Sequence, residues 1–195
     1  VLLGIAVMTN ASIPLSQSNH GESFYYFKHQ LIYGLGIGLL AFFFFYKIDI
    51  SILKKFGLPA LILAIILLCL VFVPKIGFGA LGAKRWISLF GFSFQPAEFA
   101  KLALVVYLAH WLESKKDKIK KPVMIFPFLL WIGIICGLVI LQPDFGTFLV
   151  ICSTAFVMYF VAGSDLKTMG LVFLTGLALM ATLIAVEPYR RERFT

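Results

Sequence analysis

Residues 123–163 read VMIFPFLLWIGIICGLVILQPDFGTFLVICSTAFVMYFVAG, and this stretch decides the fold. Two apolar runs, at about 123–141 and 147–163, flank a short turn, and Asp144 is the only charged residue between 123 and 163. Each run approaches or reaches the roughly 17–25 residues that a helix needs to cross the hydrocarbon core of a bilayer. Because backbone groups in lipid must be hydrogen-bonded within the segment, we expect two transmembrane helices joined by a tight turn.

The same pattern continues on both sides of this stretch. Further apolar runs lie at about 30–46, 57–73, 97–112 and 169–186, and residues 1–8 form a shorter one. The strand alternation of a transmembrane barrel is absent. The predicted fold class is therefore all-α: a polytopic transmembrane helical bundle with six full spans and a partial first span. We expect residues 1–195 to be a single integral-membrane domain that is truncated at both ends.

The composition excludes whole classes of protein. Hydrophobic residues make up 61% of the chain and charged residues 13%, and the mean hydropathy is +0.99. A soluble domain carries about 25% charged residues, so a soluble enzyme is excluded, and disorder requires low hydrophobicity. The net charge is +8, but most basic residues lie between apolar runs, which indicates membrane lipids and topology rather than nucleic acid. The three cysteines lie within apolar runs, and we predict neither a disulfide nor a metal site for them.

The basic loops orient the spans. One set of loops contains Lys47, Lys54 and Lys55, the lysine cluster at 115–121, and Lys167. We assign this side to the cytoplasm, since cytoplasmic loops carry an excess of Lys and Arg. The opposite loops contain more glycine, proline, glutamine, tryptophan, arginine and acidic residues, a mixture that topology does not require. Any chemistry is therefore expected on the outer face.

The first candidate site is residues 77–87, Gly-Phe-Gly-Ala-Leu-Gly-Ala-Lys-Arg-Trp-Ile. Glycines let backbone amides approach an anion closely, and the planar guanidinium of Arg85 suits phosphate oxygens. Trp86 could stack on a sugar or a lipid headgroup. The alternative is an interfacial tryptophan with a flanking cation, which is common in membrane proteins.

The second candidate site is residues 95–101, Gln-Pro-Ala-Glu-Phe-Ala-Lys, at the start of a span. Proline at the first helical position and Glu98 in the first turn are typical of a helix start. Lys101 lies one turn inside the span and shares a helix face with Glu98, so each charge could neutralise the other. Ionisable residues within the membrane indicate function; the alternative is that Lys101 extends its ammonium to the interface.

The third and fourth candidate sites lie in other outer loops. Residues 142–147, Gln-Pro-Asp-Phe-Gly-Thr, repeat the Gln-Pro-acid pattern. Asp144 could simply cap the next helix, or it could converge with Glu98 and Lys101 on one cavity if their helices are neighbours. Residues 187–193, Glu-Pro-Tyr-Arg-Arg-Glu-Arg, place cations at the outer surface, where a lipid-linked phosphate or an acidic protein patch could bind them.

Taken in order, residues 82–87, 95–101 and 142–147 resemble the SEDS family (shape, elongation, division and sporulation) of bacterial cell-wall synthesis. The segment from 187 to 195 resembles the division branch more than the elongation branch. The resemblance covers the whole chain. It implies a protein of about ten helices in the bacterial inner (cytoplasmic) membrane, at the division septum.

The implied activity is that of a peptidoglycan glycosyltransferase, which polymerises lipid II, an undecaprenyl-pyrophosphate-linked substrate, into glycan strands. The implied partners are a class B penicillin-binding protein and other divisome proteins, and no nucleic acid. Two other functions stay open: a lipid II flippase, which would need a polar path through the membrane, and a non-catalytic scaffold that activates the penicillin-binding protein.

The resemblance also assigns roles to single residues. Its proposed catalytic aspartate lies beyond Thr195, so the catalytic residue is unknown here and the fragment alone is expected to be inactive. Supporting catalytic roles are implied for Glu98, Lys101 and Asp144. Substrate binding is implied for five residues: Arg85, Trp86, Gln95, Arg190 and Arg193. No protein metal site is expected, although a divalent cation, Mg²⁺ or Mn²⁺, could assist the cations that stabilise the leaving pyrophosphate.

Overall fold

The computed structural model describes residues 4, 7, 11–14, 16–18, 21–74, 76–80, 83–89, 92–165, 170, 174 and 176. The chain divides into two compact units, residues 1–52 and 53–195. Residues 170, 174 and 176 are helical, and the rest of the predicted span at 169–186 lies outside the described residues.

The first unit contains one long helical stretch, Tyr25–Lys47, that is long and apolar enough to cross a membrane. It consists of α2 (Tyr25–His29), a π-helical segment η1 (Gln30–Gly36) and α3 (Ile37–Lys47). The span predicted at 30–46 is thereby confirmed as a helix. Asp49 follows it, and its Oδ1 accepts a hydrogen bond of 2.9 Å from the backbone amide of Ser51 at the start of the next helix.

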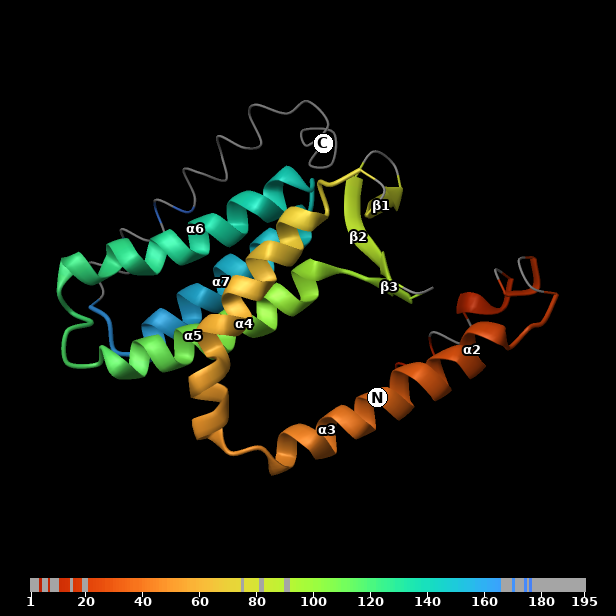
Figure 1. Cartoon of the computed structure of the whole chain (residues 1–195), viewed down its shortest axis with the longest axis horizontal. Helices are drawn as coiled ribbons and strands as arrows, with labels where there is room; N and C mark the ends of the chain where they lie inside the picture. The colour runs from red at the N-terminus through yellow and green to blue at the C-terminus, as the bar shows by residue number, and fades with distance from the viewer. Residues whose placement is uncertain are drawn as a thin grey trace. The chain divides into compact units, whose positions relative to one another are not determined.

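The second unit contains a bundle of helices that lie side by side in Figure 1. These are α4 (Ile50–Leu70), which begins just before the boundary between the units, α5 (Pro96–Ser114), α6 (Ile125–Leu141) and α7 (Phe145–Val161), with a short 3₁₀ turn η2 (Pro122–Met124) before α6. Helix α4 is also long and apolar enough to cross a membrane, and α6 and α7 are shorter apolar helices. The runs predicted at 57–73, 97–112, 123–141 and 147–163 are confirmed as helices, although α4 begins and ends earlier than the predicted 57–73.

Small residues set the spacing of these helices. Helix α5 buries Ala97, Ala100 and Ala103, and small side chains on a packed face let membrane helices approach closely. On α4, a Cβ atom added to Gly57 would lie 3.3 Å from the Cα of Tyr107 on α5. Larger buried side chains complete the core: Leu61, Leu104, Leu108, Phe128, Ile135, Phe148 and Tyr159.

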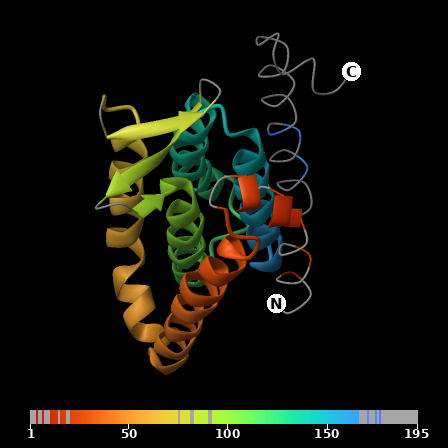
Figure 2. The same cartoon turned by 90° about the vertical axis from the view of Figure 1, so that its right-hand side faces the viewer.

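A three-stranded antiparallel sheet stands where the sequence predicted only an outer loop. Its strands are β1 (Gly77–Ala80), β2 (Ala83–Leu89) and β3 (Phe92–Phe94), in the order β1-β2-β3. Figures 1 and 2 show the sheet beyond the end of α4 and the start of α5. Residues alternate along β2, since Ile87 is buried while Trp86 and Ser88 are exposed, and this short alternation was hidden by the surrounding glycines. The sheet is the one exception to the predicted all-α class within the described residues.

Candidate functional site

The turn between α6 and α7 is the centre of a hydrogen-bonded network at the predicted outer end of the bundle. Asp144 is the N-cap of α7: its Oδ1 accepts from the backbone amide of Thr147 at 3.2 Å, and its Oδ2 accepts from the Thr147 hydroxyl at 2.9 Å. The amide Nε2 of Gln95 donates to the same Oδ2 at 2.9 Å. The buried carboxylate of Asp144, with 7% of the residue exposed, therefore joins the start of α7 to the start of α5.

Gln142 ties the same turn to α4. Its Nε2 donates to the carbonyl oxygen of Leu68 at 3.1 Å, and the residue is 1% exposed. Its Oε1 is buried and has no hydrogen-bond partner among the described residues. Each glutamine of the two Gln-Pro-acid repeats thus bonds a different helix from its own. The sequence showed the repeat but not this role, because the partner of a side-chain amide depends on which helices are neighbours.

Arg85 on β2 fixes the sheet to the turn. Its Nε donates to the carbonyl oxygen of Gln142 at 3.1 Å, and its Nη2 donates to the carbonyl oxygen of Pro143. These carbonyls follow the end of α6, where a helix leaves acceptors unbonded and where its dipole favours a cation. The guanidinium predicted to bind substrate is therefore already engaged by the backbone of the turn.

Glu98 and Lys101 form the ion pair that their spacing predicts. The Lys101 Nζ lies 2.9 Å from the Glu98 Oε1, with the lysine side chain 26% exposed and the glutamate side chain 58% exposed. Among the described hydrogen bonds, none joins Asp144 to either residue; Asp144 reaches α5 through Gln95 instead. The structure thus places the ion pair and Asp144 at the same end of α5, in two separate clusters.

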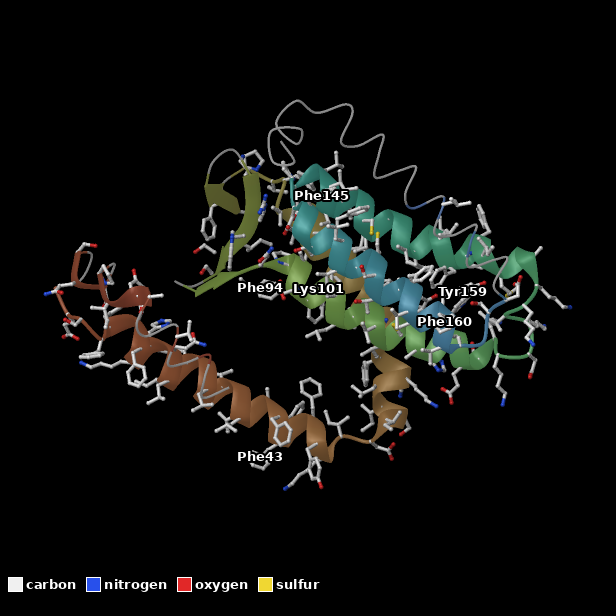
Figure 3. The ribbon with its side chains drawn as sticks, turned by 180° about the vertical axis from the view of Figure 1, so that it is seen from behind. Phe43, Phe94, Lys101, Phe145, Tyr159 and Phe160 are labelled. Carbon is white, nitrogen blue, oxygen red and sulfur yellow. The ribbon has the colours of Figure 1, made fainter. Side chains whose placement is uncertain are left out.

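A cavity of about 40 Å³ adjoins Lys101 between α5 and α7. Figure 3 shows Lys101 near the start of α5. The other lining residues follow one face of each helix: Leu104, Val105 and Leu108 on α5, and Val150, Ile151, Thr154, Ala155 and Met158 on α7. A single ammonium therefore stands at one end of an otherwise nearly apolar cavity.

The remaining predicted residues fall in different places. Trp86 is 39% exposed and lies opposite Phe78 in the sheet. Arg190 and Arg193 lie outside the described residues. In the described part of the chain, no three His, Cys, Asp or Glu side chains form a group that could hold a metal ion. The Sγ atoms of Cys136 and Cys152 lie 3.6 Å apart on α6 and α7, a contact that the sequence did not indicate.

Comparison with known proteins extends over the whole chain. The FTSW_RODA_SPOVE family model, described as "Cell cycle protein", matches residues 1–195. The chain is 37% identical over 196 residues to a "Probable peptidoglycan glycosyltransferase FtsW" of Geobacter sp. (strain M18), covering 98% of this chain and 52% of that relative. It is 39% identical over 197 residues to the protein of the same name in Haemophilus influenzae, covering 100% and 49%.

A solved structure is also similar. It is described as "Structural coordination of polymerization and crosslinking by a peptidoglycan synthase complex", and it matches with a TM-score of 0.73 and 32% identity, over 98% of this chain and 57% of that one. The chain spans about half the length of the curated relatives it matches.

Proposed function

Because this chain belongs to the FtsW/RodA/SpoVE family of cell cycle proteins, which are multi-span membrane proteins, we propose that the whole protein is a septal peptidoglycan glycosyltransferase that polymerises lipid II. The names of its relatives support this activity. The observation that carries the proposal is the ion pair of Glu98 and Lys101 at the outer end of α5, beside an apolar cavity. A lipid-linked pyrophosphate needs this combination of a cation and an apolar surface.

In the proposed reaction a sugar hydroxyl attacks the anomeric carbon of a lipid-linked sugar. The bond from that carbon to the pyrophosphate breaks, and the hydroxyl proton passes to a carboxylate base, a role worth typically 10²–10⁴-fold in rate. On the family resemblance, the base would lie beyond Thr195. The Lys101 ammonium would stabilise charge on the leaving pyrophosphate, and Glu98 would hold that ammonium in place. The cavity beside Lys101 would receive the first part of the polyprenyl chain.

We assign different roles to the other predicted residues. Arg85, Gln95 and Asp144 position the turn and the starts of α5 and α7, since their polar groups bond to one another or to the turn. Trp86, which is partly exposed on β2, would stack on a substrate sugar. The two arginines at 190 and 193 would bind substrate phosphate.

A divalent cation, Mg²⁺ or Mn²⁺, is part of the proposal as a partner of the pyrophosphate. Mg²⁺ is commonly held by one or two carboxylates together with substrate phosphates. The exposed carboxylate of Glu98 bonds Lys101 through Oε1 and could supply its other oxygen as one such ligand, whereas both oxygens of Asp144 are occupied by Thr147 and Gln95. The cation would neutralise charge on the leaving group.

We further propose that the protein acts in the bacterial inner membrane at the division septum. Its partners would be a class B penicillin-binding protein, which crosslinks the glycan product, and other divisome proteins. The similar peptidoglycan synthase complex supports a partner of this kind.

Glycan synthesis by the full-length protein tests the proposal. The protein would be purified with its penicillin-binding partner, whose transpeptidase is blocked, and supplied with labelled lipid II. We expect a ladder of glycan strands on a gel, and we expect Lys101→Ala to lower the rate about 10²-fold, as removal of one charge-stabilising donor typically does. Lys55→Ala, an exposed lysine on the predicted cytoplasmic side, is the matched control and should keep the wild-type rate.

Two results separate the alternatives, one from this assay and one from growing cells. Intact binding of lipid II and of the partner without a ladder would contradict the polymerase and favour the flippase or the scaffold. The combined exchange Glu98→Lys and Lys101→Glu restores an ion pair but reverses the charge beside the cavity. Septal growth that survives this exchange would favour the scaffold.

A further inference from the structure

The loop between α5 and α6 carries an unusually dense set of exposed cations. Its five lysines are all exposed: Lys115, Lys116, Lys118, Lys120 and Lys121. Among the described residues none of these five forms an ion pair, whereas Lys54 nearby on α4 lies 2.7 Å from the Glu113 carboxylate. The loop therefore presents its positive charge to whatever lies next to it.

The middle of this loop is fixed to the bundle. Ile119 is 2% exposed and belongs to the core, and its carbonyl oxygen accepts a bond of 3.4 Å from the hydroxyl of Tyr159 near the end of α7. The Tyr159 ring packs on Phe128 of α6 at 4.4 Å between centroids. Consecutive turns support the backbone, since the amides of Lys118 and Lys121 donate to the carbonyls three residues before them at 2.8 and 2.9 Å. The lysines are thus held around a buried apolar residue.

Exposed apolar side chains stand directly beside the lysines. Val123 is 73% exposed and Phe126 is 74% exposed, and the half-buried Trp111 lies one turn before the loop on α5. Lysine clusters at the end of a span, next to apolar and aromatic residues, are typical of contact with an anionic membrane surface. A soluble acidic partner would leave these apolar groups unused.

We propose that residues 115–121 form a binding site for anionic phospholipid headgroups of the leaflet on this side of the membrane. The lipid phosphates would bind the lysine ammonium groups, and Val123 and Phe126 would contact the upper part of the acyl chains. The site lies on the predicted cytoplasmic side, and it does not depend on the proposed glycosyltransferase activity.

Quenching of Trp111 fluorescence by brominated lipids in nanodiscs tests the site. The full-length protein would carry Trp86→Phe, Trp131→Phe and phenylalanine at any further tryptophan, so that Trp111 is the reporter. We expect brominated phosphatidylglycerol to quench several-fold more effectively than brominated phosphatidylcholine. The double variant Lys118→Gln and Lys120→Gln should lose most of this preference, because each lysine near an anionic surface strengthens lipid binding about five-fold. Ile119→Ser, which keeps every charge but releases the loop, should weaken the preference.

The control removes two other lysines of the same predicted side, Lys47→Gln and Lys55→Gln, and should keep the preference. Equal losses in both double variants would overturn the proposal, because net charge alone would then explain the effect. If Ile119→Ser kept the full preference for phosphatidylglycerol, lipid binding would not require the loop to be fixed to the bundle. The absence of any lipid preference, together with a change in Trp111 emission on adding polyglutamate, would replace the lipid by an acidic protein partner.

Discussion

At the scale of single residues, polar side chains of the predicted outer end bond mainly to the protein itself. Gln95 and Arg85, both expected to bind substrate, donate to the Asp144 carboxylate and to the carbonyls of the turn. The location of Gln95 at the start of a helix, and of Arg85 in the connection before it, could be predicted from the sequence. Their partners could not, because these bonds join residues about fifty positions apart whose proximity only the packed helices create.

Asp144 should matter for stability through its acceptor oxygens. We expect Asp144→Ala to lower the free energy of unfolding by about 1–3 kcal/mol, since the helix cap is lost and buried donors lose their acceptor. Asp144→Asn should cost less than half of that, because asparagine also caps helices well. Thermal unfolding of the detergent-solubilised protein, followed by tryptophan fluorescence, measures both, with Asp117→Ala in the exposed loop as control. Equal losses for the alanine and asparagine variants would contradict this account.

Asp49 should titrate below the ordinary range of an aspartate. The backbone amide of Ser51 donates to its carboxylate and lowers the pKa of Asp49. A lowered pKa in the folded state means that the stabilisation is fully present above the pKa of the unfolded chain, about 3.9, and is lost as the pH falls through the folded-state pKa. Carbon NMR of labelled aspartate measures the pKa directly. Asp49→Asn should remove this pH dependence, and an Asp49 pKa at or above the ordinary value would refute the prediction.

At the scale of elements, helix positions could be predicted well and the sheet could not. A long apolar run at 123–141 permits little besides a membrane helix, and α6 occupies 125–141. Strand β2 spans only seven residues, too short for its alternation to stand out among glycines. One of those glycines, Gly77, allows a close approach to the end of α4, since a Cβ atom there would overlap the Val71 carbonyl. The sequence suggested an anion-binding role for the same glycine-rich stretch.

Replacing each of two glycines by alanine should change the stability of the protein in opposite directions, because only one of them lies at the contact of α4 with α5. Gly57→Ala would place a Cβ atom 3.3 Å from the backbone of Tyr107, whereas Gly133→Ala on α6 meets no atom within 4 Å. Alanine is worth roughly 0.5–1 kcal/mol more than glycine inside a helix, so Gly133→Ala should be neutral or stabilising. Gly57→Ala should have a free energy of unfolding about 1–2 kcal/mol lower than that of Gly133→Ala, because the added methyl group overpacks the contact of α4 with α5. Chemical denaturation in detergent gives the comparison, and a stabilising Gly57→Ala would show that the helices separate at no cost.

At the scale of the whole molecule, hydropathy predicts a polytopic bundle because lipid leaves few alternatives to helices. Loop charge predicts its orientation, and this can be measured. A cysteine introduced at Asp117 should react only with membrane-permeant maleimide in intact spheroplasts, and one introduced at Ser93 should also react with an impermeant maleimide. Both would be placed in a background in which the native cysteines are alanine. If the impermeant reagent labelled position 117 and not position 93, the orientation would be the reverse of the predicted one, and the proposed glycan chemistry would lie on the cytoplasmic side.

The two hydrogen bonds from Arg85 to the turn have a mechanical consequence. Two nitrogens of one planar guanidinium attach β2 to the turn that follows α6, and the turn is itself attached to α4 through Gln142 and to α5 through Gln95. A force applied to the sheet from outside the membrane would therefore be carried through these hydrogen bonds to the turn and to the ends of α4 and α5. The first turn of α5, and with it the ammonium of Lys101, would shift together with the sheet.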